Sequence, residues 1–176
     1  EMYITTGDAH ASDTYSIGIL KSNDGGQTWD TTGMQFGITD DKMVNKVIIH
    51  PTYTDSLFAV TDKNIKISAD GGQTWSNAQT SSGSTMIGRF RDIEFKPNNP
   101  NILYAVKQTT GSSEVYKSTD RGLSWSSAMN GISLVNRNRP LLAVTPANPD
   151  VVYVLFCKND YGFHGIYKST DNADSW

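Results

Sequence analysis

The stretch KSNDGGQTW, at Lys21–Trp29, occurs in four variants along the chain. The other three are ISADGGQTW at Ile67–Trp75, KSTDRGLSW at Lys117–Trp125 and KSTDNADSW at Lys168–Trp176. The copies open with Ser22, Ser68, Ser118 and Ser169, at intervals of 46, 50 and 51 residues. A repeat of this length is typical of a four-stranded propeller blade.

The sequence around each copy predicts the strands of such a blade. An apolar run that ends in proline precedes the last three copies: KVIIHP at Lys46–Pro51, DIEFKP at Asp92–Pro97 and LLAVTP at Leu141–Pro146. A turn rich in Asn, Pro and Asp follows each run, and then comes a second apolar strand. These second strands place Tyr3, Phe58, Tyr104 and Tyr153 in register. A third strand leads into the repeated phrase, and the tryptophan opens a fourth.

We therefore predict an all-β fold, a β-propeller of four-stranded antiparallel blades. The blades are expected at residues 1–34, 43–80, 90–130 and 139–176. The first lacks its inner strand, and the last stops as its fourth strand begins. Glu1 is not an initiator methionine and strand-like residues follow it at once, so we expect an arc of three to four blades, truncated at both ends. The expected partners are the remaining blades of the parent chain or other subunits.

The repeated phrase has a structural logic. Serine and aspartate two residues apart can bond nearby backbone amides and hold a tight turn. Glycine allows positive φ, and tryptophan supplies a large apolar face that we expect to be buried at Trp29, Trp75 and Trp125. Ala173 departs from the pattern, because the other copies have glycine there. The residues to which we assign this structural role are Ser22, Asp24, Gly26, Trp29, Ser68, Asp70, Gly72, Trp75, Ser118, Asp120, Gly122, Trp125, Ser169, Asp171 and Trp176.

Composition excludes several classes of function. The net charge of −3 gives no electrostatic basis for a nucleic-acid partner. No apolar run approaches the roughly 20 residues of a membrane span. Cys157 is the only cysteine, which excludes an internal disulfide and a cysteine-based metal site. No cofactor and no metal are predicted.

The pattern S-x-D-x-G-x-[TS]-W at intervals of about 50 residues resembles the Asp-box, or bacterial neuraminidase repeat, over essentially the whole chain. That repeat occurs in sialidases, xyloglucan-degrading glycoside hydrolases, sortilin-type receptors and photosystem assembly factors. It also occurs in large secreted bacterial surface proteins, including those of the type IX export route. TGDAHASDTYSIGILKSNDGGQTW, at Thr6–Trp29, resembles the last group most. The resemblance implies a secreted or cell-surface protein.

The resemblance also implies where a ligand would bind: on the face made by the strand 2–3 loops and the blade junctions. Two of these loops, Gly7–Tyr15 and Lys158–His164, are rich in acidic and aromatic residues. Carboxylates with aromatics suit a sugar, and aspartate with histidine can bind a cation, although the same residue types also shape loops. The candidate ligand-binding residues are Asp8, His10, Asp13, Tyr15, Asp160, Tyr161, Phe163 and His164.

Enzymatic readings find less support in the sequence. A sialidase needs an arginine cluster, which Arg89, Arg91, Arg137 and Arg139 could supply, but the Arg-Ile-Pro phrase of that family is absent. A xyloglucanase needs two aspartates across a cleft, for which Asp8 and Asp13 are the candidates. We assign no catalytic residue. The preferred interpretation is a binding or scaffolding segment that presents a loop face to a glycan, a peptide or another subunit. The alternatives are a fragment of a xyloglucanase-type glycoside hydrolase and an intracellular assembly factor.

Overall fold

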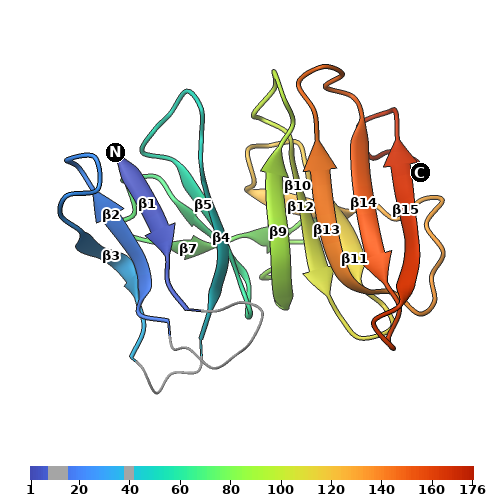
Figure 1. Cartoon of the computed structure of the whole chain (residues 1–176). Helices are drawn as coiled ribbons and strands as arrows, with labels where there is room; N and C mark the ends of the chain where they lie inside the picture. The colour runs from blue at the N-terminus through green and yellow to red at the C-terminus, as the bar shows by residue number, and fades with distance from the viewer. Residues whose placement is uncertain (8–15, 38–41) are drawn as a thin grey trace.

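The computed structural model of the chain describes residues 1–7, 16–37 and 42–176. All its regular elements are β-strands, and they form sheets that stand side by side in chain order along an arc (Figure 1). The prediction of an all-β fold is confirmed. Since none of the described residues forms a helix, none of them forms a helix able to cross a membrane.

The first two sheets have three and four antiparallel strands. The first contains β1 (Met2–Thr5), β2 (Gly18–Ser22) and β3 (Asp30–Gln35). The second contains β4 (Val44–Ile49), β5 (Leu57–Thr61), β6 (Ile65–Ser68) and β7 (Ser76–Asn77).

The last two sheets have five and three strands. The third contains β9 (Arg89–Phe95), β10 (Leu103–Gln108), β11 (Glu114–Ser118) and β12 (Ser124–Ser127), joined by β8 (Gln79–Thr80). The fourth contains β13 (Asn138–Val144), β14 (Val152–Cys157) and β15 (Phe163–Ser169).

Strand register follows the repeat. Tyr3, Phe58, Tyr104 and Tyr153 each pair with the residue directly before a repeat serine, which confirms that they are equivalent. β1 therefore corresponds to the second strand of the later sheets. The repeats do stack as successive copies of one unit.

Strand β8 is a feature that the sequence did not predict. It follows the second sheet in the chain but pairs in parallel with β12 of the third sheet, where Gln79 is opposite Ser124. The amide of Ser81 also donates to the carbonyl of Trp125 at 2.9 Å. This short strand ties the second sheet to the third by backbone hydrogen bonds.

The apolar core lies between neighbouring sheets. The cluster between the second and third sheets contains Phe58, Phe90 and Trp125, and the cluster between the third and fourth contains Tyr104 and Phe156. A smaller cluster joins the first sheet to the second. Burying one such side chain contributes about 1.5–3 kcal/mol, so the aromatic and aliphatic side chains between the sheets stabilise their stacking.

Burial of the repeat tryptophans differs from the prediction. Trp125 is 1% exposed, as expected, but Trp29 and Trp75 are only partly buried. Trp125 pairs through its backbone with β8 and belongs to the cluster that contains Phe58 and Phe90, whereas Trp75 packs at the margin of the small cluster. The cover over each indole comes from neighbouring segments, which the repeat phrase does not specify.

Each repeat folds into the same hairpin, which we call the box hairpin (Ser22–Trp29, Ser68–Trp75, Ser118–Trp125 and Ser169–Trp176). The serine hydroxyl donates to the aspartate two residues on at 2.7–2.8 Å. It also accepts the amide of the residue four positions on at 2.8–2.9 Å. The aspartate in turn accepts an amide and a hydroxyl from the residue before the tryptophan.

The two residues after each aspartate adopt positive φ. Gly122 has a φ of 77° and its predecessor Arg121 has 60°. Ala173 keeps the same turn with a φ of 66°, and its methyl group is buried in the core between the third and fourth sheets. A left-handed conformation costs a residue with a Cβ about 1–2 kcal/mol, so the hydrogen-bonded frame of the hairpin tolerates this departure.

We predict that Gly122→Ala destabilises the fold more than Gly25→Ala. Both glycines have positive φ, at 77°, so both variants pay about 1–2 kcal/mol for a left-handed alanine. A Cβ at Gly122 would lie 2.6 Å from Cε1 of Phe58, whereas a Cβ at Gly25 meets nothing within 4 Å. Overpacking of this kind adds roughly 1–3 kcal/mol. Urea unfolding measures the difference, and equal losses would show that the hairpin does not press on Phe58.

The box aspartates make stability depend on pH. The hydroxyl and amide of Thr74 lower the pKa of Asp70 to about 2, from an ordinary value of 3.8. Because the folded pKa is the lower one, the ionised carboxylate stabilises the fold fully above the unfolded pKa, and this contribution is lost as the pH falls toward about 2. The melting temperature should therefore fall across this interval, and Asp70→Asn should lose part of that dependence. An Asp70→Asn profile parallel to that of the unmodified protein would contradict the assignment.

Candidate functional site

The candidate ligand residues predicted from the sequence come from two loops. Asp8, His10, Asp13 and Tyr15 lie outside the described residues. Their role stays a prediction. The candidates of the second loop lie in the turn between β14 and β15 and at the start of β15.

Asp160 shapes the turn in which it lies. Its carboxylate accepts the amide of Gly162 at 3.0 Å, and the amide of Lys158 donates to the Gly162 carbonyl at 2.7 Å. Tyr161, between them, has a φ of 65°. The acidic group predicted for ligand binding is thus engaged within its own loop.

The aromatic residues of this loop divide into two kinds. Tyr161 and Phe163 are 66% and 64% exposed. His164 instead packs against Phe156 and Tyr167, and its Nε2 lies 3.1 Å from the carbonyl oxygen of Val135. The structure therefore presents the two exposed aromatic side chains as a surface and gives the histidine a partner in the protein.

Three arginines gather beside this surface. Arg89 and Arg91 belong to β9, and Arg139 belongs to the neighbouring strand β13 (Figure 1). Burial lowers the pKa of Arg91, and the positive charges of Arg89 and Arg139 act in the same direction. The guanidinium carbon of Arg139 also lies 4.6 Å from the ring centroid of Tyr161, a cation–π distance.

Register places these arginines at the loop end of the sheets. Arg89 pairs with Gln108, the last residue of β10, and Asn138 pairs with Cys157, the last residue of β14. The strand 2–3 loops start from those residues. The arginines thus lie at the end of the strands where the ligand face was expected.

Arg137 is not part of the group, although the sequence offered it beside Arg139. It is 3% exposed and donates to the carbonyl oxygens of Ser113, at 2.8 Å, and Ser133. Residues two apart in a regular strand share a face, but β13 is irregular between Asn138 and Leu141, and Arg139 has a φ of 41°. The irregularity turns Arg139 outward and leaves Arg137 inside.

The nearby carboxylates are held by a lysine. Lys46 Nζ lies 2.8 Å from Asp92 and 2.7 Å from Glu94, and Asp92 also accepts the amide of Leu142 at 3.0 Å. These contacts link the first strands of three sheets. The arginine group suits an anionic ligand. Within the described ranges, no group of three or more His, Cys, Asp and Glu side chains is arranged to hold a metal.

Successive antiparallel sheets, standing side by side along an arc, define this chain as a β-propeller segment, and solved structures support that class. An ancestral GH74 enzyme superposes with a TM-score of 0.72 at 21% identity over 98% of this chain and 23% of its own. The GH74 xyloglucanase from Xanthomonas campestris gives a TM-score of 0.73 at 14% identity over 99% and 27%. The chain spans about a quarter of these proteins, and the likeness shows the fold alone.

A family model identifies the chain more closely. The model described as Sortilin-Vps10 (Sortilin, neurotensin receptor 3) matches residues 18–138 and 63–176, so the chain belongs to this family. A comparison with curated protein sequences finds no significant match.

Proposed function

We propose that this chain is a binding segment of a larger β-propeller and that its arginine-bearing loop face takes an acidic peptide segment of a partner protein. The observation that supports this is that Arg89 and Arg91 of β9 and Arg139 of β13 lie at the loop end of neighbouring sheets, where Arg139 also contacts the exposed ring of Tyr161. Positive charges gathered on one face attract an anionic partner and orient it. Each guanidinium can also bind a carboxylate through two parallel hydrogen bonds.

The apolar surface beside the arginines favours a peptide over a sugar. Leu134 and Val135 are 68% and 70% exposed, and Val135 is tied to the start of β15 through His164. Tyr161 and Phe163 extend this surface. A peptide with both acidic and apolar side chains would contact both parts.

We also propose that the parent protein is secreted or attached to the cell surface. Resemblance of the repeated phrase to the Asp-box, or bacterial neuraminidase repeat, and of Thr6–Trp29 to proteins of the type IX export route, supports this. For the box serines, aspartates and tryptophans we propose a structural role, whatever the location of the protein. Fractionation of the native cells tests the location.

The structure adds no support for the alternative of a xyloglucanase-type hydrolase. Asp24, Asp70, Asp120 and Asp171 each accept hydrogen bonds within their own hairpins. The other aspartates considered, Asp8 and Asp13, lie outside the described residues. We therefore propose binding without catalysis.

Binding of a short peptide of alternating glutamate and leucine tests the proposed function, with the glutamine version of the peptide as the neutral probe. The unmodified protein should bind the glutamate peptide preferentially. The double variant Arg89→Gln/Arg139→Gln should bind it at least about tenfold more weakly, since each lost hydrogen bond to a charged group costs about 1.5–3 kcal/mol. Titration calorimetry measures the affinity for the glutamate peptide and for the glutamine peptide. Each titration is done at two salt concentrations.

Lys168→Gln is the matched control, because it removes an exposed cation from β15 and should leave the affinity unchanged. The proposal would be overturned if the unmodified protein bound both peptides with equal affinity. It would also be overturned if the double variant bound the glutamate peptide as tightly as the unmodified protein does. Hyaluronan serves as an acidic glycan probe. If the double variant lost binding to hyaluronan but not to the peptide, the ligand of this face would be a glycan and not a peptide.

A further inference from the structure

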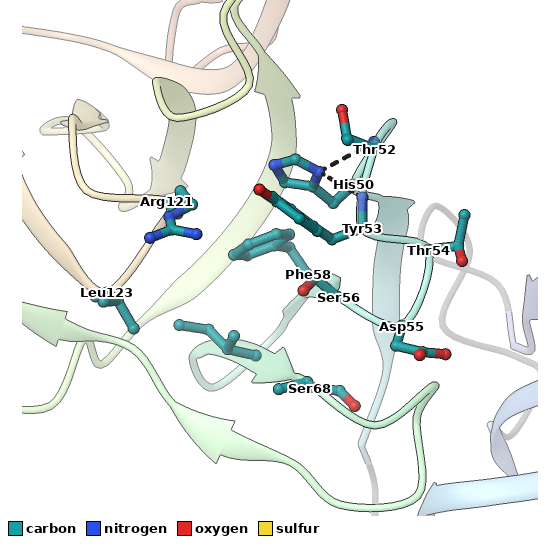
Figure 2. Close-up of a pocket in the computed structure, with 12 residues that line it drawn as sticks. His50, Thr52, Tyr53, Thr54, Asp55, Ser56, Phe58, Ser68, Arg121 and Leu123 are labelled. Carbon is teal, nitrogen blue, oxygen red and sulfur yellow. Dashed lines mark hydrogen bonds between the residues drawn. The ribbon is translucent and has the colours of Figure 1, made fainter.

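A second feature lies at the other end of the strands. A cavity of about 660 Å³ lies between the second and third sheets (Figure 2). It is lined by the turn that joins β4 to β5 and by residues of the second and third box hairpins. Phe58, Ile67 and Leu123 form its apolar walls, and His50, Tyr53 and Arg121 line it as well. Its size falls within the range of small-molecule sites.

His50 brings an unpaired donor to this cavity. Its Nδ1 accepts the amides of Thr52 at 3.2 Å and Tyr53 at 3.1 Å, which places the ring proton on Nε2. The residue is 2% exposed, and Nε2 is buried with no partner among the described residues. Burial lowers the pKa of His50, and the charge of Arg121 lowers it further, so both favour the neutral form of the ring. A buried donor without an acceptor costs about 1–3 kcal/mol.

The next junction, between the third and fourth sheets, is built on the same backbone. The amide of Arg121 donates to the carbonyl of Asn101 at 2.9 Å, and the amide of Asn172 donates to the carbonyl of Asp150 at 3.0 Å. Each donor follows a box aspartate, and each acceptor lies in the turn before a second strand. The two junctions can therefore be compared position by position.

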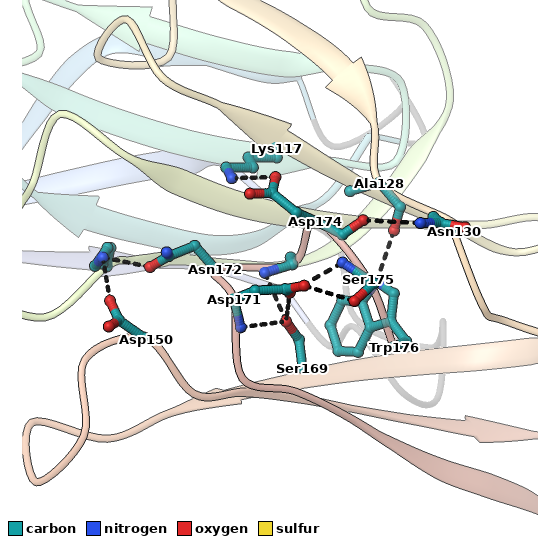
Figure 3. A network of polar contacts seen from close by, with 12 residues as sticks. Lys117, Ala128, Asn130, Asp150, Ser169, Asp171, Asn172, Asp174, Ser175 and Trp176 are labelled. Carbon is teal, nitrogen blue, oxygen red and sulfur yellow. Dashed lines mark hydrogen bonds and ion pairs between the residues drawn. The ribbon is translucent and has the colours of Figure 1, made fainter.

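At that next junction the polar groups satisfy one another. Lys96 is the residue that corresponds to His50 of the sheet before. Its Nζ lies 2.6 Å from a carboxylate oxygen of Asp150 and also donates to the side chain of Asn172. Figure 3 shows Asp150 and Asn172 at this junction. One cation meets one carboxylate and one amide. None of these three side chains has a buried polar atom without a partner, in contrast to His50.

At the cavity the corresponding positions carry donors without the carboxylate. His50 and Arg121 replace Lys96 and Asn172, while Asn101 replaces the acidic Asp150. In the described part of the chain no carboxylate pairs with Arg121. Asp55 also lines the cavity, but Figure 2 shows its carboxylate directed away from both donors.

We propose that this cavity binds a small organic carboxylate with an apolar body. The carboxylate takes the place that Asp150 has at the next junction and accepts hydrogen bonds from Arg121 and from Nε2 of His50. The apolar body lies against Phe58, Ile67 and Leu123. Tyr53 is 56% exposed and its ring lies 4.9 Å from that of His50, so the proposal requires this exposed ring to turn aside for the ligand to reach the buried Nε2.

Phenylacetate and hexanoate, with their neutral amides, test the proposal on the whole protein. NMR of the His50 ring follows binding. Each carboxylate should shift the Nε2 resonance, raise the pKa of His50 and bind at least about tenfold more tightly than its amide. Failure of both carboxylates to change the His50 signals, or equal affinity of acids and amides, would overturn the proposal.

Two variants use residues that the next junction already carries. Arg121→Asn supplies the residue found at Asn172, which keeps the left-handed turn, and it should weaken carboxylate binding at least tenfold. Asn101→Asp supplies an internal carboxylate that competes for Arg121, and it should weaken binding as well. Unchanged affinity in both variants would contradict the proposed contacts.

The double variant Arg89→Gln/Arg139→Gln separates this site from the loop face. It alters the opposite end of the strands and should leave phenylacetate binding unchanged. Loss of phenylacetate binding in this variant would place the carboxylate at the arginines of the loop face instead and would overturn the cavity as the site.

Discussion

The hydroxyl of the box serine holds each repeat together. In every copy the serine residue is at most 2% exposed, and its hydroxyl donates to the aspartate and accepts the amide four residues on. One small group thus fixes a turn with two consecutive left-handed residues, a conformation that would otherwise be strained. The hairpin in turn positions the tryptophan and the end of the third strand, on which the next sheet packs.

A hairpin fixed in this way leaves its outward positions free to vary. The residue after the aspartate is glycine in the first two copies, arginine in the third and asparagine in the fourth. The residue before the proline varies in step, from His50 to Lys96. Two junctions with the same backbone therefore differ in chemistry. The junction between the third and fourth sheets contains an ion pair, whereas the junction between the second and third sheets contains a cavity lined by two donors. The opposite end of the sheets varies independently, through strand irregularity and loop sequence.

The strands could be predicted because their signals are local. Apolar runs, a proline after each inner strand and Asn- and Asp-rich turns mark one blade after another, and the register of Tyr3, Phe58, Tyr104 and Tyr153 followed from aligning the copies. Strand β8 is two residues long and has no pattern of its own. Trp75 and Trp125 differ in burial because different neighbouring segments cover their indole rings. The sequence of the repeat does not predict these segments.

The sites were harder to predict because they depend on pairs of segments. Only the irregularity in β13 separates Arg137 from Arg139, and only the fold brings Arg139 to Arg91. His164 contacts Val135, and its predicted role in ligand binding stays a prediction. The cavity needs His50 and Arg121 together, from neighbouring sheets. An alignment of the copies does point to the cavity, because the charge changes at both positions from one repeat to the next. His50 corresponds to Lys96, and Arg121 corresponds to Asn172.

Amide hydrogen exchange measures the central claim, that the box serine hydroxyl holds the hairpins. The amides of Gly72, Gly122 and Ala173 are the ones that this hydroxyl accepts in buried surroundings. They should exchange as slowly as the core amides of β5 and β10, because they open only when the blade unfolds. Exchange of these three amides at the rate of an unprotected peptide, while the strands stay protected, would contradict the account.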